Sequence, residues 1–172
     1  MDLKGLIRDV ADFPIKGVGF KDITTLLQNK KAFAYAIDKL AKPYLDKKID
    51  KVIAIDARGF LLAAPLAYKL KAGVCLVRKK GKLPYKTIQA SFKKEYGMDI
   101  LTMHKDAVGK EEKVLIADDV LATGGTIMAT VKLVEKLGGK IVGISVLIDL
   151  PFLGGSKKLE KYKLKSLVVY EK

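Results

Sequence analysis

The sequence has one cysteine, one histidine and three arginines in 172 residues, and each scarcity excludes a class of protein. A lone Cys75 excludes an internal disulfide and is typical of a reducing compartment, so we expect a cytoplasmic protein and a buried, structural thiol. His104 has no cysteine or second histidine near it, which argues against a structural zinc site. No apolar run approaches the roughly 18 residues of a membrane span, so no membrane partner is expected.

Basic residues dominate the charge, because 33 Lys and Arg against 19 Asp and Glu leave a formal net charge of +14. Such a balance can indicate a nucleic-acid partner. With only three arginines among the 33 basic residues, however, nearly all are lysines, and they are spread along the whole chain. Specific base contacts rely heavily on arginine, so the sequence favours a lysine-rich solvated surface and no nucleic-acid partner.

Apolar segments alternate with amphipathic ones along the chain, and no repeat, low-complexity tract or linker divides it. The alternation predicts an α/β fold, a mainly parallel central sheet flanked by helices, in a single domain over 1–172. The polar stretch 79–96 is long for a connection, as functional lids often are. We expect strands over 52–55, 73–77, 87–92, 99–102, 114–117, 141–149 and 167–170, and helices from 33 to the turn at 47–48, over 60–70 and over 127–137.

The most informative segment is Val114–Thr126 (VLIADDVLATGGT), where an apolar run ends in two acids and a Gly-Gly turn opens a helix. Open α/β sheets bind ligands at such junctions. Gly124 and Gly125 allow a close backbone approach, and the N–H groups of a helix start favour a phosphate. The pair Asp118–Asp119 would repel a bare phosphate and suits ribose hydroxyls or a bridging Mg²⁺. The pattern predicts a sugar-phosphate site; a helix cap beside two strand-end acids is the alternative.

The segment matches neither the P-loop pattern nor the Rossmann fingerprint. It resembles the phosphoribosyl-diphosphate-binding motif of the type I phosphoribosyltransferases. The resemblance implies that Asp118 and Asp119 hold the ribose hydroxyls. It also implies that the loop of Ala122, Thr123, Gly124, Gly125 and Thr126 wraps the 5′-phosphate.

Four further segments are similar to the members of this family that act on adenine, and the similarity covers nearly the whole chain. They are 12–23 (DFPIKGVGFKDI), 56–60 (DARGF), 78–84 (RKKGKLP) and 95–97 (EYG). The resemblance implies the type I phosphoribosyltransferase fold, with a small base-binding hood over 1–30 and a flexible lid loop over 78–97. The implied reaction is a step of purine salvage. It transfers 5-phosphoribosyl from phosphoribosyl diphosphate to N9 of adenine and gives AMP and diphosphate.

In such a reaction the departing diphosphate must be neutralised. The implied cofactor is Mg²⁺, carried by substrate oxygens with no direct protein ligand. The resemblance places Ala57, Arg58, Arg78 and Lys82 around the diphosphate. It also implies a non-proline cis peptide, expected between Ala57 and Arg58, and a homodimer in which Arg78 reaches the neighbouring subunit's site. An ordinary βα turn at 56–59 and a solvated charge run at 78–82 are the alternatives.

The resemblance assigns adenine to the N-terminal segment. Phe20 would stack on the purine, and backbone groups of Gly19 and Lys21 would read its polar edge. Val120 and Leu121 would form the opposite wall. Plain core packing of Phe20 is the alternative.

Glu95 is the candidate catalytic residue, as proton acceptor or hydrogen-bond partner of the adenine imidazole edge, and Tyr96 would close over the sugar. A surface glutamate is the alternative interpretation of Glu95. Two other functions also remain open. One is a 6-oxopurine phosphoribosyltransferase, which would be expected to lack the segments 12–23 and 95–97. The other is a regulatory protein that senses phosphoribosyl diphosphate, which would be expected to carry a DNA-binding domain.

Overall fold

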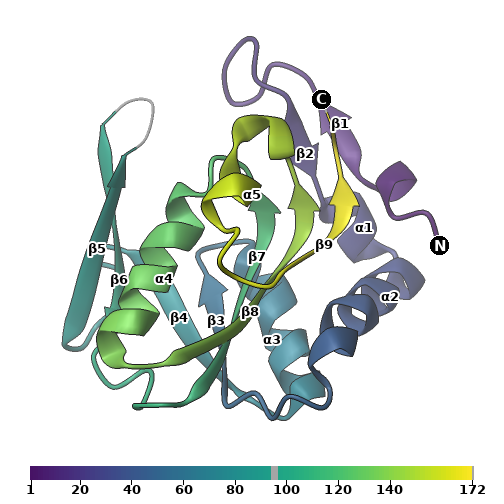
Figure 1. The fold of residues 1–172 in the computed structure, drawn as a ribbon. Coiled ribbons are helices and arrows are strands. Elements are labelled where there is room, and N and C mark those ends of the chain that lie inside the picture. Colours follow the sequence, from purple (N-terminus) through teal and green to yellow (C-terminus); the bar gives the residue numbers. More distant parts are fainter. Residues whose placement is uncertain (94–96, 172) are drawn as a thin grey trace.

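The alternation of apolar and amphipathic segments produces a central sheet, which the computed structural model shows for the described residues, 1–93 and 97–171 (Figure 1). The parallel strands are β3 (Lys51–Ile55), β4 (Gly73–Lys79), β7 (Lys113–Leu121), β8 (Lys140–Asp149) and β9 (Leu164–Val169), and the antiparallel hairpin is β5 (Thr87–Lys93) and β6 (Met98–His104). Within the described residues the strand order is β5-β6-β4-β3-β7-β8-β9. The sheet is mainly parallel, as predicted, and the hairpin extends one of its edges.

Helices cover both faces of the sheet because alternate side chains of each central strand enter opposite cores. In β3, Ile53 and Ile55 pack in the core beneath α4, whereas Val52 and Ala54 pack with α2 and α3. None of the helices in the described residues combines the length and hydropathy needed to cross a bilayer. The covering helices are α2 (Lys30–Ala41), α3 (Gly59–Leu70) and α4 (Gly125–Leu137).

A small two-stranded sheet precedes the central one. Its strands pair antiparallel, with Val10 opposite Phe20, and lie beside the carboxyl ends of β8 and β9 (Figure 1). Three-residue strands have no periodicity to detect, so the sequence did not predict them. The remaining elements are β1 (Arg8–Val10), β2 (Phe20–Asp22), α1 (Thr24–Gln28) and α5 (Gly155–Lys158), with 3₁₀ turns at Lys4–Leu6, Lys42–Tyr44 and Pro151–Leu153.

One predicted strand is longer than its apolar run. We expected β7 to end at Ala117, but pairing continues to Leu121, which lies opposite Asp149 of β8. The two acids therefore lie inside the strand, because the hydrogen-bond ladder follows the partner strand rather than the hydropathy of one chain. Cys75 is buried, as expected, and its thiol donates a hydrogen bond to the Ala107 carbonyl oxygen over 2.9 Å.

Leu115→Ala tests the core that joins β7 to the α2–α3 layer. Leu115 is fully buried, so its truncation should lower the free energy of unfolding by about 2–5 kcal/mol. Urea unfolding followed by circular dichroism measures the loss. Leu45→Ala removes the same atoms from an exposed position and should change stability by no more than about 0.5 kcal/mol. Equal effects of the two variants would contradict the assignment of Leu115 to the core.

Candidate functional site

The loop 122–126 joins the end of β7 to the start of α4, as predicted, and its two glycines have no room for side chains. Gly124 has φ +78°, and a Cβ there would lie 3.0 Å from Gly155 Cα. A Cβ on Gly125 would lie 2.7 Å from the Phe92 ring. Residues 120–127 line a small cavity of about 70 Å³. No acid lies in the first turn of α4, so its N–H groups favour an anion there.

The acid pair lies directly before this loop and is almost fully buried. Asp118 is 8% and Asp119 6% exposed, and the Asp119 backbone N–H donates to Asp118 Oδ1 over 2.9 Å. Burial raises the pKa of both carboxyls, and the neighbouring Asp119 charge raises the pKa of Asp118 further, well above its usual range. The Arg58 guanidinium opposes both shifts. A hydroxyl or cation brought by a ligand would therefore stabilise the charged form of these buried carboxyls.

Arg58 connects the acid pair to the N-terminal segment. It lies at the start of α3, and its Nε is 2.7 Å from Asp119 Oδ2. The contact is an ion pair and not a hydrogen bond, since Asp119 Oδ2 accepts no hydrogen bond from the part of the chain that the structure describes. The guanidinium carbon lies 4.6 Å from the centroid of the Phe20 ring, a cation–π contact. Phe13 contacts the same ring edge-on, with centroids 4.9 Å apart. The structure thus brings together Phe20, Arg58 and Asp119.

The turn at 56–59 is packed tightly against the acid pair. A Cβ on Gly59 would lie 2.8 Å from Asp118 Oδ1, so this glycine permits the close approach. The non-proline cis peptide expected here is present, but it joins Asp56 to Ala57. Our prediction of the Ala57–Arg58 bond was wrong by one residue, because the residue types indicate the turn but not which of its peptide bonds is cis. Ala57 itself is exposed.

Arg78 holds the same turn from the next strand. Its Nε lies 3.0 Å from Asp56 Oδ2, and its Nη1 donates to the Lys82 carbonyl oxygen over 3.3 Å. The guanidinium carbon is 5.9 Å from the Phe60 ring centroid. Arg78 therefore fixes Asp56 within its own chain, a partner that the sequence did not suggest. The side chain of Lys82 is exposed.

Two of the other predicted adenine-site residues, Gly19 and Lys21, are the chain neighbours of Phe20. The Lys21 side chain pairs with Asp9, with Nζ 2.6 Å from Oδ2, and the sequence assigned only the backbone of Lys21 to the base. The nearest atom to a Cβ on Gly19 would be 4.0 Å away, so the position has open space. Val120 is half-buried and Leu121 fully buried beside the loop 122–126. Glu95 and Tyr96 lie outside the described residues, so the catalytic and lid assignments stay predictions.

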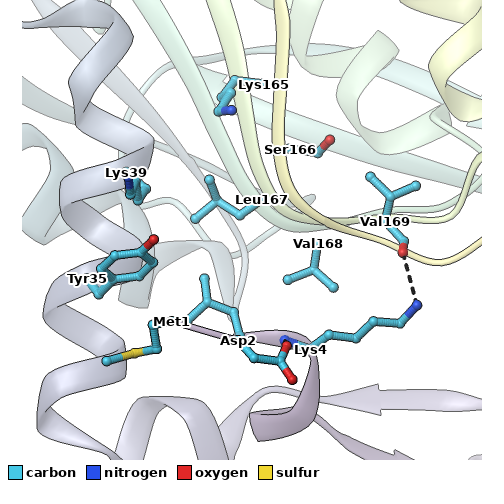
Figure 2. Close-up of a pocket in the computed structure, with 11 residues that line it drawn as sticks. Met1, Asp2, Lys4, Tyr35, Lys39, Lys165, Ser166, Leu167, Val168 and Val169 are labelled. Atoms are coloured by element: carbon cyan, nitrogen blue, oxygen red, sulfur yellow. Dashed lines mark hydrogen bonds between the residues drawn. The ribbon is translucent and has the colours of Figure 1, made fainter.

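A larger cleft, of about 350 Å³, lies elsewhere and contains none of the predicted site residues. Figure 2 shows it between the N-terminal segment, α2 and β9, with Lys4 donating to the Val169 carbonyl oxygen over 3.4 Å. Volume alone therefore does not locate the site. The predicted loop lines the smaller cavity instead, and the strand that leads into this loop carries the buried acid pair and its contact with Arg58.

Comparisons with known proteins show the family to which the chain belongs. Residues 23–170 match the family described as phosphoribosyl transferase domain, and the chain belongs to this phosphoribosyltransferase family. The relatives that it matches include adenine phosphoribosyltransferases. The enzyme from Brachyspira hyodysenteriae is 55% identical over 170 residues, which cover 99% of this chain and 100% of the relative. The predicted family is thereby confirmed.

Solved structures confirm the predicted fold. Adenine phosphoribosyltransferase from Thermoanaerobacter pseudethanolicus is 51% identical, with a TM-score of 0.95 over 98% of each chain. The enzyme from Saccharomyces cerevisiae, solved with adenine and an imino-altritol bisphosphate, is 34% identical, with a TM-score of 0.90 over 96% of each chain. The central sheet with its flanking helices is therefore the type I phosphoribosyltransferase fold.

Asp118→Asn tests the electrostatics of the buried pair. Folding raises the pKa of Asp118. The protein therefore loses stability as pH rises from the pKa of this carboxyl in the unfolded state toward its pKa in the folded state, because the unfolded state releases the proton first. The Asn variant lacks this penalty. Its stability relative to the original protein should thus increase as pH rises above about 4, measured by urea unfolding from pH 4 to 8. A difference that does not vary with pH would show that Asp118 titrates normally.

Proposed function

We propose that this protein transfers the 5-phosphoribosyl group of phosphoribosyl diphosphate to N9 of adenine, forming AMP and diphosphate in purine salvage. One observation carries the proposal: the phosphate loop, the buried pair Asp118–Asp119 and the contact between Arg58 and Phe20 share one edge of the sheet. The adenine phosphoribosyltransferases to which the chain is similar over 98% or more of its length support the choice of base.

The phosphoribosyl group is assigned to the loop and the acid pair. The 5′-phosphate would accept hydrogen bonds from the backbone of 122–126 and from the hydroxyls of Thr123 and Thr126. Asp118 and Asp119 would accept hydrogen bonds from the vicinal ribose hydroxyls, which would offset part of the cost of burying their charges. The sugar is thereby held at both ends while its anomeric carbon faces the base.

The leaving diphosphate is assigned to Ala57, Arg58, Arg78 and Lys82, with Mg²⁺. The acid pair fits a nearby ion, since Asp119 Oδ2 is buried, accepts no hydrogen bond from the described residues, and would lose its charge partner if Arg58, 2.7 Å away, moved to the diphosphate. Those residues contain no cluster of three or more His, Cys, Asp or Glu side chains that could hold a metal, so substrate oxygens would provide most of its ligands. When bound, the ion would neutralise the developing negative charge of the diphosphate.

The base is assigned to Phe20, with backbone groups of Gly19 and Lys21 at its polar edge and Val120 opposite. The Arg58 guanidinium covers one face of the Phe20 ring. A purine that stacks on the same face has to displace this guanidinium, so binding of the base and release of Arg58 for the diphosphate would occur together. Glu95 is proposed as the proton acceptor and Tyr96 as the lid residue over the sugar, both on sequence resemblance.

A homodimer is also part of the proposal, and the chain has a surface suited to it. Leu61 and Tyr68 lie on one face of α3 and are 51% and 88% exposed. Val74 and Leu76 of β4 are 44% and 38% exposed on the sheet face that α3 covers. An exposed apolar cluster of this kind is typical of protein interfaces. We name these four residues the α3–β4 surface; it adjoins the site, because α3 begins next to Arg58.

The proposed location is the cytoplasm. Cys75 is a free, buried thiol, and burial raises its pKa, which keeps it in its unreactive protonated form. A single unpaired cysteine of this kind suits a reducing compartment. No nucleic-acid partner or membrane partner is proposed, since the lysines are spread over the chain rather than gathered in one segment.

Formation of AMP from adenine, phosphoribosyl diphosphate and Mg²⁺, with hypoxanthine and guanine run alongside, tests the function. Product from adenine alone is expected. Gly125→Val should lower the rate on the order of 10²-fold or more, because its side chain would displace the loop or Phe92. Ala34→Val, on the exposed side of α2, adds similar bulk and should leave the rate unchanged. Product from the oxopurines would overturn the base assignment, and binding without any product would favour the sensor alternative.

Leu61→Glu tests the α3–β4 surface. In a twofold interface the variant buries two unpaired charges among apolar side chains. The dimer dissociation constant, measured by analytical ultracentrifugation, should therefore rise by at least about 10²-fold. Leu45→Glu introduces the same charge at another exposed leucine, outside this surface, and should leave the dimer intact. A monomeric original protein, or equal dissociation of both variants, would overturn this choice of surface.

A further inference from the structure

The phosphate loop is held from behind by the segment that follows β8. The Gly155 backbone N–H donates to the Ala122 carbonyl oxygen over 3.0 Å. The Lys158 ammonium donates to the Thr123 carbonyl oxygen over 2.7 Å, from the last residue of α5. Two successive carbonyls of the loop are therefore tied to one short segment. No motif in the sequence singled out these residues.

These contacts determine where the loop's N–H groups point. In a trans peptide unit the carbonyl oxygen and the following N–H point in opposite directions. Fixing the Ala122 and Thr123 oxygens toward α5 turns the N–H groups of Thr123 and Gly124 away from it. The Gly124 oxygen is likewise occupied, by the Met128 N–H at 2.9 Å in the first turn of α4. Within the described residues these two loop N–H groups have no acceptor, so both remain free for an anion.

The holding segment is itself anchored to the sheet. Ser156 Oγ donates to the buried carboxylate of Asp149, with 2.8 Å to each oxygen, at the end of β8. The Leu150 N–H donates to the Leu121 carbonyl oxygen over 2.9 Å, which joins the same point to the end of β7. A side chain on Gly155 would overlap the Ala122 oxygen, so only glycine allows this approach. The position of Lys158 is thus set by the ends of two strands.

We propose that Lys158 is a positioning residue for the phosphate loop. It holds the Thr123–Gly124 peptide unit with its N–H toward the phosphate, and its charge adds positive potential behind the loop. Because Lys158 acts through the Thr123 carbonyl oxygen, it controls affinity for the 5′-phosphate rather than the chemical step or the base. The inference rests on the proposed function, because it assigns Lys158 a role in binding phosphoribosyl diphosphate.

Lys158→Met tests the inference by steady-state kinetics of AMP formation. The KM for phosphoribosyl diphosphate should rise about tenfold, the effect of losing one hydrogen bond from a charged donor. The kcat and the KM for adenine should stay near the original values. Lys157→Met is the matched control, since Lys157 is an exposed neighbour on the same helix, and it should change none of the three constants. Lys158→Arg keeps a charged donor and should restore most of the affinity.

The outcomes separate this inference from the proposed function. If the original protein forms no AMP, the proposed function fails, and calorimetric titration with ribose 5-phosphate still compares the loops of the original protein and the Met variant. Weaker binding of ribose 5-phosphate by the Met variant alone would support the inference in that case. Unchanged affinity, an equal loss in Lys157→Met, or a fall in kcat without a change in KM would overturn it.

Discussion

The site depends on two adjacent carboxylates that are buried at the end of a sheet. Burial disfavours the charges of Asp118 and Asp119, which raises the pKa of both, and Arg58 offsets part of this cost. The same arginine lies on the Phe20 ring, so the ion pair also sets the position of the N-terminal segment. A ligand that brings hydroxyls and a cation to the acids would relieve the remaining cost and free Arg58.

The rest of the fold makes this arrangement possible by bringing distant segments to one edge. Parallel strands place the turn at 56–59, the loop at 122–126 and the segment 149–158 at neighbouring carboxyl ends. Side chains that alternate along the strands form a hydrophobic core on each face of the sheet, so the strands that carry these loops are packed on both sides. Glycines at 59, 124 and 155 then permit contacts that any side chain would prevent. Rigid support and close approach together pre-organise the candidate site.

Much of the site was predictable because its chemistry is local. The acids, glycines and threonines of 118–126 are contiguous, and their meaning follows from where a strand ends and a helix begins. Contacts between distant residues were not predictable in this way. The pairing of Arg78 with Asp56, the Phe92 ring against Gly125 and the Lys158 contact with Thr123 each join side chains or backbone that only folding brings together. The end of β7 was misjudged for the same reason, since its partner β8 decides it.

The sequence by itself determined the α/β class, the glycine turn after the acid pair and the family, because each depends on the order of residue types along short segments. Only the tertiary structure decided which charged groups form ion pairs, which carbonyl oxygens accept hydrogen bonds and which peptide bond in the turn at 56–59 is cis. The physical reason is range. Helix and strand preferences act over a few residues, whereas burial and ion pairing depend on neighbours supplied by distant parts of the chain.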